Sequence, residues 1–118
     1  MTWVVEFYEE DDGSAPVEEF LAQLPKQHRD KSLQIVKLLE EAGPTLPFPY
    51  SSQVRGKIRE LRTQYGKGKI RILYFADRRR RFILLHAFMK RTEKLSAAEI
   101  EIAERRMMRH EQEAGKSD

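Results

Sequence analysis

The hydrophobic and polar positions change their spacing several times along the chain, and each change marks a predicted element. Residues 3–8 (WVVEFY) are mostly β-branched or aromatic, and an acidic segment that ends at Gly13 follows them. A short run of this kind, closed by turn residues, is typical of a β-strand. The chain therefore begins with a predicted strand.

Two amphipathic helices are predicted next. Apolar residues recur at intervals of three and four within residues 16–24 and again within 26–42, and Pro25 separates the two patterns. Gly43 and Pro44 end the second pattern. We expect the second helix to bury a wide apolar stripe, which consists of Leu33, Ile35, Val36, Leu38, Leu39 and Ala42.

The middle of the chain predicts an extended loop and then three strands. Residues 45–53 hold prolines around apolar side chains, which favours a loop rather than a regular element. The strand-like segments that follow are 57–62, 69–76 and 82–90. Because short turns connect them, with glycines at 66 and 68 in the first, they predict an antiparallel meander.

A third helix is predicted at the end of the chain. Ser96 and Glu99 have the spacing of a capping box, and Leu95 and Ile100 have the spacing of a hydrophobic staple. Residues 110–118 are polar, and we expect them to form a frayed tail.

Together these elements predict an α+β fold: a four-stranded, largely antiparallel sheet with the order β-α-α-β-β-β-α. We expect the first two helices to share one face of the sheet, because both have an apolar stripe to bury. The third helix is expected beside the basic strands. A single domain over residues 1–109 accounts for the whole pattern.

Composition excludes several classes of protein. The chain has 118 residues and no cysteine, which excludes a disulfide scaffold, a thiolate zinc site and thiol catalysis. Its three histidines fall on separate predicted elements, so we expect no metal site and no cofactor. No apolar run approaches the length of a membrane span, and we expect a cytoplasmic protein.

Charge separates strongly along the chain, although the net charge is only +3. Residues 55–94 hold 14 basic and 3 acidic side chains, a net +11, whereas residues 1–54 are net −6. The basic side chains of this region are Arg55, Lys57, Arg59, Arg62, Lys67, Lys69, Arg71, residues 78–81, Lys90, Arg91 and Lys94. A polyanion such as RNA is the natural partner of this surface, although a solvated hairpin face is the alternative.

Arg71 and Tyr74 stand out within the strand 69–76. Strand alternation places Arg71 on the same face as the apolar residues 73 and 75, and Tyr74 on the opposite face. Arg71 therefore either contacts a phosphate or ligand, or forms a buried ion pair with Glu60 or Asp77. Tyr74 is either a core residue or a site residue.

Two further candidates lie on or after the last strand. His86 is flanked by apolar residues, so it is either a hydrogen-bonded core histidine or a site residue. Lys90 and Arg91 end the strand just before a capped helix, where they either meet a substrate phosphate or lie in solvent.

The stretch 57–108, with KIRELR, then GKIRILYF, then ILLHAFMKRTEKLSAAEIEIAERRM, resembles the phage-derived Gp49-like branch of the RelE/ParE toxin superfamily, which includes HigB-type toxins. The resemblance implies the toxin of a type II toxin–antitoxin pair. It implies an endoribonuclease that cuts mRNA, in many members on the ribosome. It also implies an antitoxin partner, expected as a helix-turn-helix protein encoded next to the toxin.

The family motif also implies roles for single residues. Arg71 matches the arginine that would stabilise the phosphate, and Lys90 and Arg91 match the pair that closes the last strand. The expected catalytic set is Arg71, Tyr74, Lys90 and Arg91. The expected RNA-binding set is Lys57, Arg59, Arg62, Lys69, His86 and Lys94.

The general base is left open by the sequence. Lys90 or Tyr74 would need a pKa lowered by the surrounding positive charge, and Glu93 and His86 are second choices. Two other functions also remain open. A ParE-like toxin would bind and inhibit a topoisomerase without chemistry of its own, and a noncatalytic module would only bind RNA.

Overall fold

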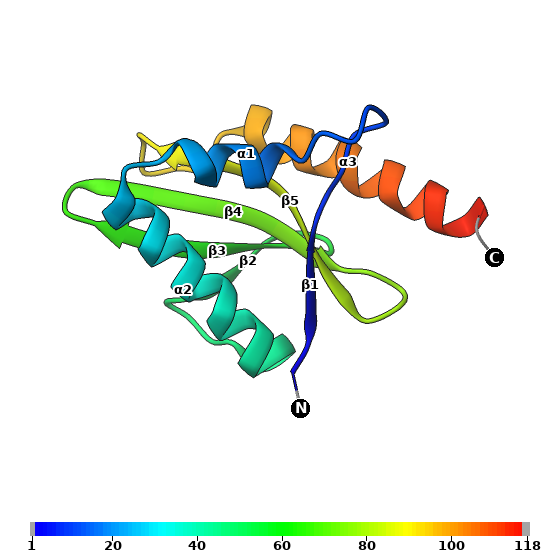
Figure 1. Ribbon diagram of the computed structural model, residues 1–118, viewed down its shortest axis with the longest axis horizontal. Helices are drawn as coiled ribbons and strands as arrows, with labels where there is room; N and C mark the ends of the chain where they lie inside the picture. Colours follow the sequence, from blue (N-terminus) through cyan, green and yellow to red (C-terminus); the bar gives the residue numbers. More distant parts are fainter. Residues whose placement is uncertain (1, 117–118) are drawn as a thin grey trace.

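The computed structural model describes residues 2–116 (Figure 1). In this part of the chain the elements are β1 (Val4–Phe7), α1 (Pro16–Gln23), α2 (Lys26–Ala42), the short 3-10 helix η1 (Gly43–Thr45), β2 (Ser51–Arg55), β3 (Ile58–Tyr65), β4 (Gly68–Ala76), β5 (Arg81–Lys90) and α3 (Ala97–Lys116). The strands form one five-stranded sheet in the order β1-β5-β4-β3-β2. The predicted α+β class is confirmed.

The predicted four-stranded, largely antiparallel sheet is wrong in two respects. β2 adds a fifth strand at the end of the segment predicted as a loop, and it pairs antiparallel with β3. β1 pairs with β5 in parallel, with Val4 opposite Arg81, so the sheet is mixed. β1 has no local signal because its partner β5 lies far along the chain. β2 and β3 form a local hairpin with a two-residue turn at Gly56 and Lys57, but the prolines that precede β2 favoured a loop assignment for its first residues.

The helices cover both faces of the sheet, and the first two share one face, as predicted. α1 and α2 pack on one face, where the core includes Ile70, Ile72 and Tyr74 of β4 (Figure 1). α3 packs on the other face through Ala103, against a core that includes Leu73. Alternation along β4 therefore divides the molecule into two cores.

The predicted stripe of α2 is correct except at Leu33 and at Leu38, which is 37% exposed. Val36 and Leu39 are buried, but Leu33 is 47% exposed. The buried positions of α2 are Ser32, Ile35, Val36 and Leu39, at intervals of three, one and three. Leu33 lies one residue off this stripe, and the rotation of about 100° per residue turns its side chain toward solvent.

α3 begins as predicted but continues further. The Ser96 hydroxyl accepts a hydrogen bond from the backbone N–H of Ala98 at 3.2 Å, which caps the first turn. The helix then runs to Lys116, past the expected start of the tail at residue 110, while residues 117–118 lie outside the described residues. No helix among the described residues is long and apolar enough to span a membrane.

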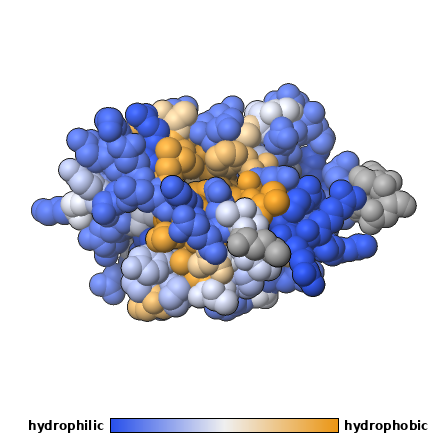
Figure 2. All heavy atoms as spheres, turned by 60° about the horizontal axis from the view of Figure 1, so that its bottom comes forward, coloured by the Kyte–Doolittle hydropathy of each residue, from blue (hydrophilic) through white to orange (hydrophobic). Residues whose placement is uncertain are grey.

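Apolar atoms are also exposed at the surface. On the face shown in Figure 2 they gather in the middle, and hydrophilic residues surround them. The exposed large apolar side chains of the described residues include Val4, Phe48, Tyr50, Tyr65 and Met108.

Candidate nucleic-acid interface

The sheet brings four of the predicted cations together on the face that carries α3. Arg62 on β3 is paired with Arg71 on β4, and Lys69 on β4 is paired with Lys90 on β5. Arg71 and Lys69 are two residues apart on one strand, so all four side chains belong to one face. Residues from three strands thus form one basic cluster.

Arg71 is buried at the base of this cluster, with 5% of its side chain exposed. Its Nη1 donates to the carbonyl oxygens of Thr63 at 3.3 Å and Ile70 at 3.1 Å, and its Nε lies 3.9 Å from Oε1 of Glu60. Burial and then the charge of Arg62 lower the pKa of Arg71, while Glu60 opposes them. Of the two ion-pair partners considered for Arg71, Glu60 is adjacent.

Asp77, the other partner considered, is engaged elsewhere. Its carboxylate accepts a hydrogen bond from Arg81 Nη2 at 2.8 Å and lies 3.0 Å from His110 Nε2. These contacts tie the turn between β4 and β5 to α3, at a distance from the basic cluster along β4.

Glu60 is a buried carboxylate that two arginines share. Its Oε1 accepts hydrogen bonds from Arg62 Nη1 at 2.9 Å and from the Ser52 hydroxyl at 3.0 Å, in addition to the longer contact with Arg71. One negative charge thus offsets only part of the two positive charges. The cluster keeps a net positive charge even before its lysines are counted.

Lys90 lies at the rim of a groove of about 210 Å³ lined by Lys67, Lys69, Lys90, Arg91, Thr92 and Glu93. Partial burial and then the charges of Arg71, Arg62 and Lys69 lower the pKa of Lys90, against the opposing effect of Glu60. A lowered pKa increases the neutral fraction of an amine, and the neutral amine accepts a proton. The groove therefore offers several cations for a phosphate and one amine whose pKa is lowered.

Two groove residues were missed by the sequence analysis. Lys67 is among the basic side chains of residues 55–94 but belongs to neither the expected catalytic set nor the expected RNA-binding set, and Thr92 is not singled out by the sequence. The sequence predicts the turn between the segments 57–62 and 69–76, but only the folded hairpin places Lys67 against the end of β5.

Tyr74 and Arg59 lie away from the cluster. Tyr74 is 2% exposed in the core under α1 and α2, and its hydroxyl is hydrogen-bonded to the Ser51 hydroxyl at 2.6 Å. Arg59 is paired with Tyr74 across the strands and donates from Nε to the same Ser51 oxygen at 3.1 Å. The structure thus does not bring Tyr74 together with Arg71 and Lys90.

His86 is half-buried between the sheet and α3. Its Nε2 lies 3.0 Å from Oε2 of Glu99, its Nδ1 lies 3.4 Å from Nη1 of Arg106, and its ring stacks on Phe88. Because arginine only donates, Nδ1 accepts and Nε2–H donates to Glu99. Burial lowers the pKa of His86, Glu99 opposes this and Arg106 adds to it. Glu99, predicted to complete the capping box, instead orients this histidine.

The remaining predicted RNA-binding residues differ in their surroundings. Lys57 forms an exposed ion pair with Glu111 of α3 at 3.0 Å. Lys94 lies in the loop before α3, where its carbonyl oxygen accepts a hydrogen bond from the Thr92 hydroxyl at 2.8 Å. Among the described residues, no group of three or more histidine, aspartate or glutamate side chains is arranged to hold a metal ion.

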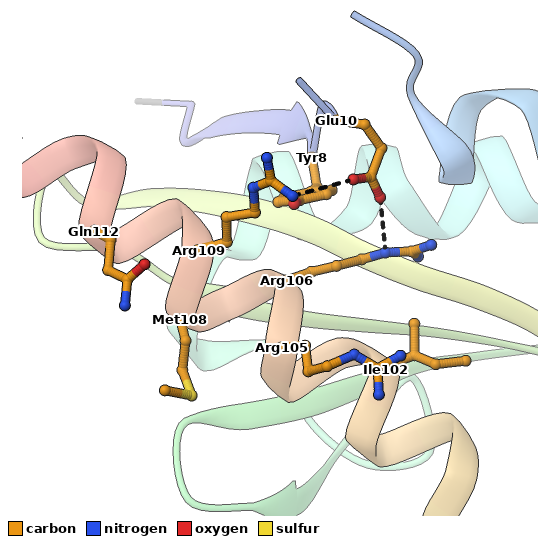
Figure 3. Close-up of a pocket in the computed structure, with 8 residues that line it drawn as sticks. All are labelled: Tyr8, Glu10, Ile102, Arg105, Arg106, Met108, Arg109 and Gln112. Atoms are coloured by element: carbon orange, nitrogen blue, oxygen red, sulfur yellow. Dashed lines mark ion pairs between the residues drawn. The ribbon is translucent and has the colours of Figure 1, made fainter. Parts of the chain in front are cut away.

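A separate pocket of about 610 Å³ lies between α3 and the loop after β1 (Figure 3). It is lined by Tyr8, Glu10, Ile102, Arg105, Arg106, Met108, Arg109 and Gln112. Glu10 contacts both Arg106 Nε at 3.4 Å and Arg109 Nη1 at 3.9 Å. The carboxylate of Glu10 is thus paired with two of the three arginines that line this pocket. The groove at Lys90, in contrast, is lined by several cations and one carboxylate.

Comparison with known proteins identifies the family. No curated protein matches the chain significantly. The family model of the phage-derived Gp49-like proteins (DUF891) matches residues 19–108, which include α2, all of β2–β5 and the first half of α3. The match covers well over half of the chain and contains the whole basic cluster. The chain therefore belongs to the phage-derived Gp49-like family, in the RelE/HigB-like toxin branch.

Proposed function

We propose that this protein is the toxin of a type II toxin–antitoxin pair and that it cleaves mRNA without a metal ion. Membership of the RelE/HigB-like toxin branch supports the toxin assignment. The observation that carries the nuclease assignment is Lys90, an amine with a lowered pKa at the rim of a cationic groove. A single-stranded RNA offers that groove a phosphate and an adjacent 2′-hydroxyl.

The reaction needs one base and a cationic environment. Neutral Lys90 takes the proton of the ribose 2′-hydroxyl, and the 2′-oxygen forms a bond to the adjacent phosphorus. The bond from phosphorus to the 5′-oxygen breaks, and that oxygen takes a proton from water. The products are a 2′,3′-cyclic phosphate and a 5′-hydroxyl. Arg91 and Lys69 stabilise the additional negative charge that forms on the phosphate oxygens.

Arg71 acts through Lys90 in this proposal. Its guanidinium is held by two backbone carbonyls, and its side chain has little exposed surface for direct phosphate contact. Its positive charge is the largest single charge effect that lowers the pKa of Lys90. Arg71 is therefore a positioning residue that increases the neutral fraction of Lys90.

A cognate antitoxin would restrain this activity by covering the groove. A segment rich in Asp and Glu complements the cations that line it, and the helix-turn-helix protein expected next to the toxin would carry such a segment. Co-expression followed by purification tests the pairing. The proposal expects a stable complex whose RNA cleavage is suppressed, and a toxin that stays free of its neighbour contradicts it.

The nuclease is tested by the ends that it leaves. Sequencing of cellular RNA shortly after induction is expected to show new 5′-hydroxyl ends within coding regions, which are absent for an Arg71→Ala, Lys90→Ala variant. With purified protein, a chelator should not stop cleavage. Intact transcripts together with accumulating DNA breaks would overturn the nuclease in favour of a ParE-like action on a topoisomerase. Intact transcripts that the protein binds would favour the noncatalytic module.

A further inference from the structure

Phe48 is an apolar side chain that the fold holds out in solvent. It is 67% exposed, the highest value among the exposed large apolar side chains of the described residues. Hydrophobicity alone does not favour an exposed position, because burial would stabilise a phenyl ring by roughly 2–3 kcal/mol. Single exposed apolar side chains are common on protein surfaces. Phe48 differs from them because its turn is fixed and an arginine lies against its ring.

The loop fixes the position of Phe48. Pro47 and Pro49 restrict the backbone on either side of it, and the backbone N–H groups of Tyr50 and Ser51 donate to the Pro47 carbonyl at 2.9 and 3.1 Å. Leu46 and Ser51 are both buried. The turn is therefore anchored at both ends, and the ring between them needs little further ordering to bind a ligand.

Arg62 holds one face of the ring. Its guanidinium carbon lies 5.1 Å from the centre of the Phe48 ring, and its Nη1 is fixed by the hydrogen bond to Glu60. The ring thus stands directly beside the basic cluster. Its large exposed area leaves room for a second planar group to stack.

A groove of about 200 Å³ lies between the end of β3 and α2, and the same arginine forms part of its lining. It is lined by Lys31, Gln34, Ile35, Leu38, Tyr50, Arg62, Thr63 and Gln64. Two amides, a lysine and a half-exposed tyrosine ring provide hydrogen-bonding groups beside apolar surface. Such a lining suits the edge and the face of a nucleobase.

The spacing of the sheet relates Phe48 to the groove at Lys90. Arg62 lies on β3 and Lys90 on β5, two strands apart on the same face. Neighbouring strands are about 4.8 Å apart, so the two side chains originate roughly 10–12 Å from each other. An extended RNA strand crosses this distance within a few nucleotides.

We propose that Phe48 is a stacking platform for one base of the RNA, a few nucleotides from the phosphate held at Lys90, and that the groove beside Tyr50 reads that base. The inference rests on the proposed RNA substrate. It adds a residue that determines affinity and sequence context without taking part in bond cleavage. Stacking on an aromatic ring tolerates every base, so preference comes from the groove.

Binding of a short single-stranded RNA with 2′-fluoro riboses tests this proposal, because this RNA has no 2′-hydroxyl to attack the phosphate. We expect Phe48→Ala to weaken binding about 5- to 150-fold, the range for loss of one stacked base. Phe48→Trp should bind as the wild type does, because it keeps the ring. Tyr65→Ala is the matched control: Tyr65 is also exposed, but it packs edge-on against His28 of α2.

Cleavage of a natural RNA gives the second measurement. We expect Phe48→Ala to raise KM with little change in kcat, and Tyr50→Ala to alter the bases found near the cut sites. Unchanged binding and cut sites in Phe48→Ala, with a wild type that cleaves, would overturn this inference alone. A variant that binds RNA normally but loses the antitoxin would assign Phe48 to a protein interface instead. A wild type that neither binds nor cuts RNA would overturn the proposed function as well.

Discussion

Lys69 and Lys90 lie directly opposite each other on β4 and β5, so two amines share the edge of one groove. Paired positions on neighbouring antiparallel strands bring side chains within about 5 Å at Cβ. Two positive charges on such paired side chains repel each other, so protonation of the second amine is less favourable. The charge of Lys69 accordingly contributes to the lowered pKa of Lys90, after burial, Arg71 and Arg62.

The pair predicts a specific change in the pH dependence of cleavage. A base must be neutral, so kcat should rise with pH and level off above the pKa of Lys90. Lys69→Ala removes a like charge, which raises the pKa of Lys90 and moves the rising part of the profile to higher pH. Single-turnover rates across a pH series measure the shift.

Lys90→Arg separates charge from proton transfer at the same position. The variant keeps a positive charge in the groove but cannot serve as a base, and we expect a rate on the order of 10²- to 10⁴-fold lower. Lys94→Ala, in the loop after the groove, should leave the pH profile in place. A profile that Lys69→Ala does not move would remove Lys90 from the role of base.

Arg71→Ala is predicted to affect both activity and stability. Loss of its charge raises the pKa of Lys90, so less neutral amine is present and growth arrest on expression should be relieved. The two hydrogen bonds to Thr63 and Ile70 are also lost, at a cost of about 1–3 kcal/mol in the free energy of unfolding. Urea unfolding and growth at matched soluble protein levels measure the two effects.

Arg71→Lys serves as the control for this variant, because it keeps the charge and loses the planar geometry. It should retain more activity than Arg71→Ala. Full toxicity of Arg71→Ala would mean that Arg71 has only a structural role, as the ion-pair partner of Glu60.

Asp77 is predicted to govern acid stability. Burial alone would raise the pKa of Asp77, but hydrogen bonds from Arg81, His110 and the backbone N–H of Arg79 outweigh it and lower the pKa to about 2. A carboxylate with a depressed pKa stabilises the fold above its unfolded pKa, near 3.8, and this stabilisation is lost as the pH falls toward about 2. The shift corresponds to about 2 kcal/mol.

Unfolding by urea at several pH values tests this contribution. We expect wild-type stability to fall between pH values of about 4 and about 2, and Asp77→Asn to be less stable near neutral pH with a weaker dependence on acid. His110→Ala should reproduce part of the loss near neutral pH. An acid dependence that Asp77→Asn leaves intact would mean that other carboxyl groups cause it.

Replacement of Gly68 by a residue with a side chain is predicted to lower the stability of the protein. A Cβ at this position would lie 2.9 Å from Nε2 of His28 and closer still to Cε1, so the imidazole packs directly on the hairpin. Gly68→Ala should therefore destabilise the protein by about 1–3 kcal/mol through overpacking. Thermal unfolding measures this, and the double variant Gly68→Ala, His28→Ala should recover part of the loss. A normal Tm for the single variant would contradict the contact.

Local patterns in the sequence were sufficient for most of the elements. Residues 26–42 form the second helix as predicted, because apolar spacing, Pro25 and Gly43 act within a few residues of one another. The strand alternation around Arg71 also correctly separated it from Tyr74, since side chains alternate on any strand whatever its partners. The basic region and the family motif lie in the same stretch, so the sequence also located the surface that carries the candidate site.

Only the tertiary structure decided how distant segments meet. The parallel pairing of β1 with β5 and the exposure of Leu33 depend on which edges and faces remain open after the other elements pack. The same holds for single side chains: Arg71 meets Glu60 rather than Asp77, and Phe48 meets Arg62. Such contacts join residues that have no periodic relation in the chain, and they form because burial and hydrogen bonding are satisfied across the whole fold at once.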